Sequence, residues 1–136
     1  MNEGVHPGGC ACGALRYEAR GAGKHVCFCH CTSCRRAAGA SPVAWVTFET
    51  REFRMTRGEL TLFRSSEPVQ RGFCAKCGTS LSYVHAARPT QIDVTIASFD
   101  EPAAFVPLRH IWVSDRIAWA PLADGLPQFQ RGSGAG

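Results

Sequence analysis

The sequence predicts a single, mainly β domain with one short helix, built around clustered cysteines. Apolar and polar residues alternate in several short segments, as they do in half-buried strands. Glycine and proline separate these segments and mark turns. The eight cysteines of the 136-residue chain lie close together in sequence, which indicates metal or redox chemistry in a cytoplasmic protein, where disulfides are rare. We expect residues 1–131 to form this domain and residues 132–136 to form a flexible, Gly/Ser-rich tail.

The strands of the N-terminal half are indicated by composition and alternation. Ala14–Arg20 alternates apolar and polar residues, and His25–Phe28 is a short apparent strand that leads into the densest cysteine cluster. Pro42–Phe48 is rich in β-branched and aromatic residues, which favour strands. We therefore expect three strands before residue 50.

The strands of the C-terminal half are shorter and are separated by proline and glycine. They comprise one short apolar segment, two alternating segments and two short final segments, which are Leu60–Phe63, Leu81–Val84, Ile92–Ile96, Arg109–Val113 and Ile117–Ala120.

One segment, which begins near Thr32 and ends at Gly39, is predicted to be a helix. Thr32 or Ser33 could cap its N-terminus, since hydroxyl side chains accept hydrogen bonds from the first turn. Cys34–Ala38 are tolerable helix formers, and Gly39 fits the C-terminal stop.

Charge and hydropathy exclude several classes of protein. The net charge of +4 suits an anionic small molecule, and without a run of five or more basic residues nucleic acid is an unlikely partner. The first ten residues show no targeting segment, and no apolar run approaches the roughly 20 residues of a membrane helix. We therefore expect a cytoplasmic protein without a membrane segment. The sequence does not indicate an oligomeric state.

Two cysteine pairs predict a closed, structural zinc site. In Cys74-Ala-Lys-Cys77 the two-residue spacing lets both sulfurs face one ion, and the glycine that follows permits a tight turn. Cys10 and Cys12 can supply the other two ligands, because residues i and i+2 of an extended segment share a face. The alternative is two unrelated pairs of buried thiols.

The remaining four cysteines predict a second zinc site with an open position. A bend between a strand and a helix could gather Cys29, Cys31 and Cys34 around one ion. Cys27 would lie about 6–7 Å further back along the strand. It is either a small buried side chain or a fourth ligand, and in the second case the site would be closed.

The ordered motifs resemble those of the glutathione-dependent formaldehyde-activating enzyme family, which also includes centromere protein V. The resemblance covers about residues 8 to 120. It rests on four stretches, which are Gly9-Cys10-Ala-Cys12-Gly13-Ala-Leu15-Arg16-Tyr17, Cys29-His30-Cys31-Thr-Ser-Cys34-Arg35, Arg71-Gly-Phe73-Cys74-Ala-Lys-Cys77-Gly78-Thr79-Ser-Leu81 and Pro107-Leu-Arg-His110-Ile111-Trp112.

The resemblance implies an Mss4-like fold of short antiparallel sheets around a structural zinc. It implies two zinc ions per chain, one structural and one catalytic. The structural ion would be held by Cys10, Cys12, Cys74 and Cys77, and the catalytic ion by Cys29, Cys31 and Cys34. The implied activity joins formaldehyde to glutathione to give S-hydroxymethylglutathione, which is a carbon–sulfur lyase reaction. Cys27 departs from the family pattern.

Candidate substrate residues follow from the chemistry of glutathione, which carries two carboxylates and one ammonium. Arg35 and Arg36 could pair with the carboxylates, or could form a solvated helix face. Arg71 matches the family motif, and could bind substrate or bond backbone near the structural zinc. His30 could donate or carry a proton near the second zinc, or could face solvent or bond backbone.

Two other functions fit the same residues. The chain could be a zinc-stabilised binding or carrier module for glutathione, protein or nucleic acid, without catalysis. It could also be a thiol redox enzyme that uses Cys27, although such an enzyme wants a reactive cysteine late in the sequence and none follows Cys77. We expect the enzyme with a small-molecule thiol substrate.

Overall fold

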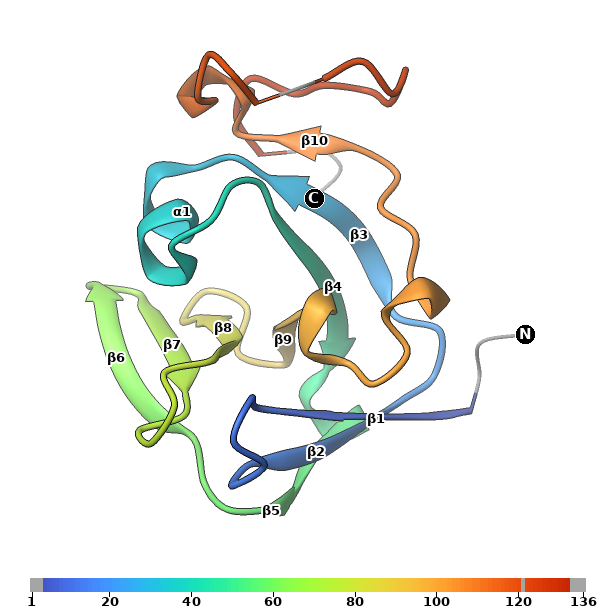
Figure 1. Cartoon of the computed structure of the whole chain (residues 1–136), viewed down its shortest axis with the longest axis vertical. Helices are drawn as coiled ribbons and strands as arrows, with labels where there is room; N and C mark the ends of the chain where they lie inside the picture. Colours follow the sequence, from blue (N-terminus) through green and yellow to red (C-terminus); the bar gives the residue numbers. More distant parts are fainter. Residues whose placement is uncertain (1–3, 121, 133–136) are drawn as a thin grey trace.

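The computed structural model of the chain describes residues 4–120 and 122–132 (Figure 1). Within these residues, ten strands form two sheets beside one α-helix and four short 3-10 helices, so the predicted mainly β fold with one short helix is confirmed. The strands are β1 Val5–Gly9, β2 Arg16–Arg20, β3 Lys24–Cys29, β4 Val43–Glu49, β5 Phe53–Arg57, β6 Thr61–Ser66, β7 Val69–Phe73, β8 Ser80–His85, β9 Gln91–Thr95 and β10 His110–Ile111. The helices are α1 Thr32–Ala38, η1 Thr50–Glu52, η2 Ile96–Ser98, η3 Pro102–Ala104 and η4 Val113–Asp115.

The smaller sheet has three antiparallel strands in the order β1-β2-β5. Its central strand, β2, buries Tyr17 and Ala19 and leaves the residues between them partly exposed, as the alternation predicts. Sequence analysis missed β1 because Gly8 and Gly9 are typical of a turn. Here Gly8 serves packing: a Cβ at this position would collide with the ring of Tyr17 and with the carbonyl oxygen of Ser98.

The larger sheet has seven strands in the order β10-β3-β4-β9-β8-β7-β6, and all pairs except β10–β3 are antiparallel. One face of it packs in the main core with Tyr17 of the smaller sheet, through side chains such as Val46 and Val94. Their neighbours in sequence, Trp45 and Asp93, point to the opposite face because side chains alternate along a strand. That second face lines the cavity described below.

Two further expectations differ from the structure. β7 contains Gly72, which the sequence suggested was a turn; a Cβ there would clash with the Ser82 hydroxyl, so glycine lets two strands approach closely. Residues Ile117–Ala120 form a turn rather than the predicted strand. The Arg116 guanidinium donates hydrogen bonds to the carbonyl oxygens of Ile117, Ala118 and Ala120, so these carbonyls face a cation instead of a neighbouring strand.

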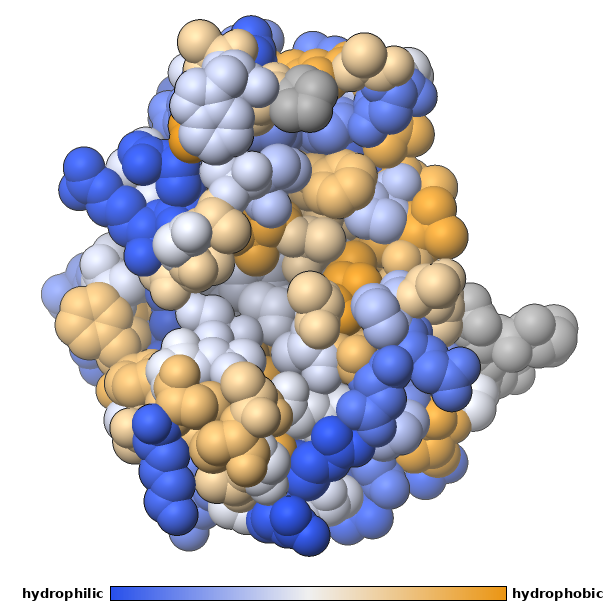
Figure 2. Space-filling view, in the orientation of Figure 1, coloured by the Kyte–Doolittle hydropathy of each residue, from blue (hydrophilic) through white to orange (hydrophobic). Residues whose placement is uncertain are grey.

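The surface carries polar and apolar side chains in separate groups. Figure 2 shows several groups of hydrophilic side chains on one face, with apolar side chains between them. Within the described residues, no helix is long and apolar enough to cross a membrane. Of the predicted tail, residues 132–136, only Gly132 lies in the described part of the chain.

The first testable prediction concerns the core between the two sheets. Leu81 is fully buried in it, so we expect Leu81→Ala to lower the free energy of unfolding by about 2–5 kcal/mol. Leu62, on the edge strand β6, is 57% exposed, so Leu62→Ala should change it by no more than about 0.5 kcal/mol. Urea denaturation at fixed zinc concentration measures both values. Equal losses for the two variants would contradict the described core.

Candidate functional site

Four cysteines from two distant loops meet in one cluster. Cys10 and Cys12 lie between β1 and β2, and Cys74 and Cys77 lie between β7 and β8. Their four sulfurs all lie within 4.8 Å of one another. The Sγ–Sγ distances are 3.6 Å from Cys10 to Cys12 and 3.8 Å from Cys12 to Cys74. Tetrahedral zinc with bonds of about 2.3 Å requires sulfurs about 3.8 Å apart, so this donor set fits zinc.

The local backbone explains how each cysteine pair turns toward the common centre. Gly13 and Gly78 follow the two pairs, and both have positive φ angles, of 80° and 79°. A Cβ at either position would meet nothing within 4 Å, so the backbone conformation and not packing calls for glycine. The hydroxyl of Thr79 joins the loops, since it accepts a hydrogen bond from Ala11 N–H (3.0 Å) and lies 3.2 Å from Cys77 Sγ. This contact lowers the pKa of Cys77 to about 5, which favours the thiolate that a metal needs.

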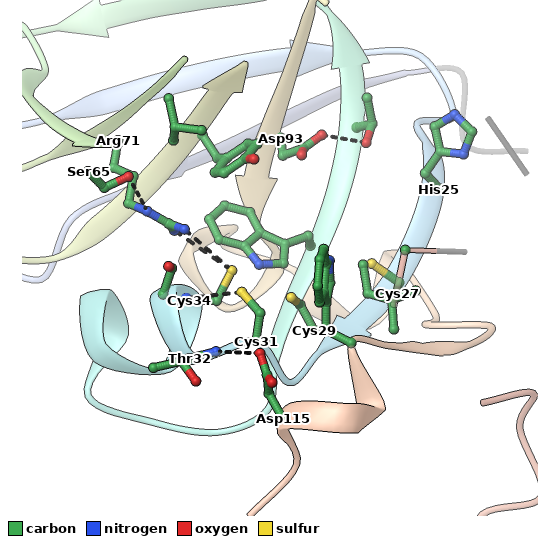
Figure 3. Close-up of a pocket in the computed structure, with 18 of the residues that line it drawn as sticks. His25, Cys27, Cys29, Cys31, Thr32, Cys34, Ser65, Arg71, Asp93 and Asp115 are labelled. Carbon is green, nitrogen blue, oxygen red and sulfur yellow. Dashed lines mark hydrogen bonds between the residues drawn. The ribbon is translucent and has the colours of Figure 1, made fainter. Parts of the chain in front are cut away.

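A second cluster forms where β3 leads into α1. Cys29 ends β3, Cys31 is the N-cap of α1, and Cys34 lies in its first turn. The Cys34 N–H donates a hydrogen bond to Cys31 Sγ (3.3 Å), so a thiol caps the helix instead of the predicted Thr32 or Ser33. The bend and the helix bring the three sulfurs within 4.8 Å of one another. Figure 3 shows Cys29, Cys31 and Cys34 side by side at the start of α1.

Each of the three thiols changes the pKa of its neighbours. Hydrogen bonds with Cys29 and, to a smaller extent, with Cys34 lower the pKa of Cys31. The hydrogen bond between Cys29 and Cys31 in turn raises the pKa of Cys29. Three sulfurs this close cannot all ionise without a cation between them. The donor set, three soft thiolates at one point, therefore fits zinc and leaves one of its four usual positions to another ligand.

Cys27 is not part of either cluster. It is buried on β3, two residues before Cys29, and it is not among the three sulfurs that lie within 4.8 Å of one another. Burial raises its pKa to about 12, which favours the neutral thiol. In Figure 3 its sulfur lies to one side of the cluster, in the wall of the cavity. The geometry therefore agrees with the interpretation of Cys27 as a small buried side chain.

Arg71 lies at the three-thiol cluster, although one interpretation of the sequence placed it near the structural zinc. It projects from β7, and its Nη1 and Nη2 donate to Cys34 Sγ at 3.8 and 3.7 Å. Its Nε donates to Ser65 Oγ (3.1 Å), and its guanidinium lies 5.0 Å from the centre of the Tyr83 ring. The side chain is buried and contacts Cys34, Ser65 and Tyr83, so its positive charge is fixed beside the sulfurs (Figure 3).

The three-thiol cluster opens into a cavity of about 700 Å³, which is within the range typical of small-molecule sites. Cys29, Cys31 and Cys34 all line it, whereas none of the four cysteines of the other cluster is among the described residues that do. Its floor is the second face of the seven-stranded sheet. Further lining residues from this sheet are Cys27, Trp45, Thr47, Arg71, Tyr83 and Asp93.

The basic residues of the cavity are not those that the sequence suggested. Arg35 and Arg36 lie on α1 outside the lining, and Arg36 is exposed to solvent. Arg88 and Arg109 line the cavity instead. Sequence analysis missed Arg88 because it lies in a loop that no motif or spacing relates to the cysteines. It missed Arg109, although this residue lies in a stretch that resembles the family, because the stretch is more than 70 residues from Cys34 in the sequence.

His30 is fully buried and does not line the cavity, so the solvent-facing alternative is wrong. A hydrogen bond joins its Nε2 to Nδ1 of His110 (2.9 Å), and Nε2 of His110 bonds to Asp124 (2.9 Å). His30 N–H also donates to the carbonyl oxygen of Ile111 (3.0 Å). These bonds attach the loop that carries Cys29 and Cys31 to the C-terminal segment.

The fold and the two clusters define a mainly β, cysteine-rich protein with two sites that could hold metal, one of them in a cavity. The sequence model of the family described as glutathione-dependent formaldehyde-activating enzyme matches residues 5–115. The chain belongs to this family. It is also similar in fold to a Rhodobacter sphaeroides protein of known crystal structure, with a TM-score of 0.57 and 22% sequence identity, over 90% of this chain and 98% of that one.

The second prediction concerns metal content. We expect wild-type protein to hold two zinc ions per chain and Cys29→Ser to hold one, because that substitution leaves two thiols in the open cluster. Cys10→Ser should in addition lower the melting temperature strongly, because its cluster joins two distant loops. Elemental analysis after removal of loosely bound metal checks the counts. A single zinc ion in the wild type would rule out two sites.

The third prediction uses Cys27 as the matched control for Cys29, from the same strand. Cys27→Ser should keep both zinc ions, since its sulfur belongs to neither cluster. The comparison by elemental analysis separates the loss of a ligand from the loss of any buried thiol. A drop to one zinc ion in Cys27→Ser would make Cys27 a ligand and the second site closed.

Proposed function

We propose that the chain is a zinc-dependent carbon–sulfur lyase that forms or cleaves S-hydroxymethylglutathione, or a related adduct of a thiol and an aldehyde. One observation carries the proposal: three thiols that could hold a metal line a cavity large enough for a small molecule. A cluster of four thiols outside the cavity has the donor set of a structural site, whereas three thiols leave room for a substrate.

Cys29, Cys31 and Cys34 would hold the zinc of the reaction. When bound, zinc would favour the thiolate form of a thiol substrate, because thiols lose their proton on coordination. A sulfur ligand also suits this site, because a metal that is bound by soft thiolates favours a further soft ligand. The cavity gives the substrate its access to these three residues.

The reaction adds a thiol across a carbonyl group. The substrate sulfur forms a bond to the aldehyde carbon, the π pair of the C=O bond moves to oxygen, and that oxygen takes up a proton while the thiol gives one up. Cleavage is the reverse. Catalysis of this reaction has two requirements: a group that holds the sulfur as thiolate, and a cation that stabilises the negative charge developing on the oxygen.

Arg71 meets the second requirement best among the described residues. Its guanidinium is always charged, it is buried beside Cys34, and Ser65 and Tyr83 hold it in place. A fixed charge of this kind needs no reorganisation as negative charge develops. The same charge offsets the surplus negative charge of three thiolates around a divalent ion.

The remaining basic residues of the cavity suit the ends of glutathione. Arg88 is exposed at the cavity surface and Arg109 is half-buried, so both are accessible to the carboxylates of a bound peptide. The proposal therefore assigns carboxylate binding to these two residues in place of Arg35 and Arg36.

The fourth prediction tests the reaction directly. We expect zinc-loaded protein to accelerate the exchange between formaldehyde and S-hydroxymethylglutathione at equilibrium, measured by two-dimensional exchange NMR with ¹³C-formaldehyde. Arg71→Gln should lower the catalysed rate by about tenfold or more, as expected for the loss of a charge-assisted hydrogen bond. Arg51→Gln, at an exposed arginine on η1 outside the cavity, is the control and should leave the rate unchanged.

Two outcomes would contradict the proposal in different ways. If wild-type protein binds glutathione but does not accelerate exchange, the chain is a binding or carrier module. If it neither binds glutathione nor accelerates exchange, the cavity serves another substrate. Tight nucleic-acid binding that survives moderate salt would instead favour an adaptor, because contacts to phosphates weaken as salt rises.

A further inference from the structure

The cavity contains a carboxylate that the proposed reaction does not use. Asp93 lies on β9 directly opposite Thr47 of β4, and both side chains line the cavity. The Thr47 hydroxyl donates a hydrogen bond to Asp93 Oδ1 (2.6 Å). Within the described residues, no cationic side chain lies within ion-pair distance of this carboxylate. One hydroxyl leaves most of the acceptor positions of a carboxylate available to a ligand.

An ionised carboxylate that is partly buried loses hydration, which costs free energy unless a cation pairs with it. Burial raises the pKa of Asp93, although the Thr47 hydroxyl and the charges of Arg88 and His25 partly oppose this effect. Arg88 and His25 both line the cavity and are exposed to solvent, so they are free to face a ligand. The surroundings of Asp93 therefore combine one half-buried anion with basic groups around it, which matches a ligand group that carries an ammonium beside a carboxylate.

The sheet register gives the distance from Asp93 to the thiol cluster. Cys29 pairs with Val43 and Asp93 pairs with Thr47, so they are separated by four residues along β4. At about 3.3 Å per residue, this offset is about 13 Å along β4. Because β3 and β9 lie on opposite sides of β4, each about 4.8 Å away, the two Cα atoms are about 16 Å apart. A ligand that reaches both must carry its ammonium far from its sulfur.

This distance selects one class of thiol. In free cysteine, three bonds join the sulfur to the ammonium nitrogen, a span of about 4 Å. In a γ-glutamylcysteine unit, eight bonds join them, a span of about 10 Å when extended. The longer unit covers most of the separation, and the Asp93 side chain with its hydrogen bond covers the rest.

We infer that Asp93 binds the α-ammonium group of a γ-glutamyl thiol and, with Arg88 on the neighbouring carboxylate, places the γ-glutamyl end of the substrate at the far end of the cavity from Cys29, Cys31 and Cys34. This inference rests on the proposed function, because it takes the substrate sulfur to lie at the three-thiol cluster. It adds a specificity rule: the protein selects for an ammonium group remote from the sulfur.

The fifth prediction tests this rule with two ligands that differ only in that group. Glutathione and its des-amino analogue, glutaryl-cysteinyl-glycine, share the thiol and both carboxylates. Zinc-loaded wild-type protein should bind glutathione about tenfold or more tightly than the analogue in isothermal titration calorimetry. In Asp93→Asn the preference should fall to less than about threefold, mainly through weaker binding of glutathione.

Asp115→Asn is the matched control. Asp115 also lines the cavity, next to Thr32 at the cluster end, so its substitution removes the same charge from the other end. This variant should keep the tenfold preference for glutathione, even if it changes both affinities. A preference lost equally in both variants would mean that only the net charge of the cavity matters, and would overturn the role of Asp93.

The wild type alone can also refute the inference. If it binds glutathione and the des-amino analogue equally well, Asp93 does not bind the ammonium group, whatever the stability of Asp93→Asn, and the proposed function stands. If it binds neither ligand, the proposed function fails and the inference fails with it.

Discussion

The structure depends on the meeting of two loops that lie more than 60 residues apart in the sequence. Cys10 and Cys12 lie in the loop between two strands of the smaller sheet, and Cys74 and Cys77 lie in the loop between two strands of the larger one. Their cluster therefore connects the two sheets at one point. The domain is small and buries a modest core, and a metal ion held by both loops would offset the entropy of closing a loop of this length. Cys10 and Cys74 belong to the main core, so the cluster lies directly against it.

The two cysteine clusters use one ligand type for different purposes because their surroundings differ. The first cluster is completed by backbone and hydroxyl groups, such as the N–H of Leu15, which donates to Cys10 Sγ (3.2 Å), and the hydroxyl of Thr79. The second has one thiol fewer and a buried arginine in contact with Cys34. A neutral shell suits a closed structural site, whereas a fixed cation beside an incomplete ligand set suits chemistry on an anionic sulfur.

Sequence analysis predicted the parts that local chemistry determines. The cysteine spacing indicated both clusters, with a glycine after each pair of the four-thiol cluster, and the alternation of β2 and β9 indicated strands. It failed where a tertiary contact overrides a local preference: Gly8 and Gly72 lie within strands because other side chains occupy the space of a Cβ. It also could not place Asp93 or Arg88 in the cavity, because the register of β9 against β4 brings Asp93 there and the loop between β8 and β9 brings Arg88.

The pleat of the seven-stranded sheet separates stability from function within single strands. On β4, Val46 and Phe48 face the main core, while Trp45 and Thr47 face the cavity. β9 repeats the pattern, with Val94 in the core and Asp93 in the cavity. Since neighbouring residues point to opposite faces, the cavity side can change its charges and its ligand while the core side keeps its packing. This arrangement allows the substrate of such a fold to change without a change in its core.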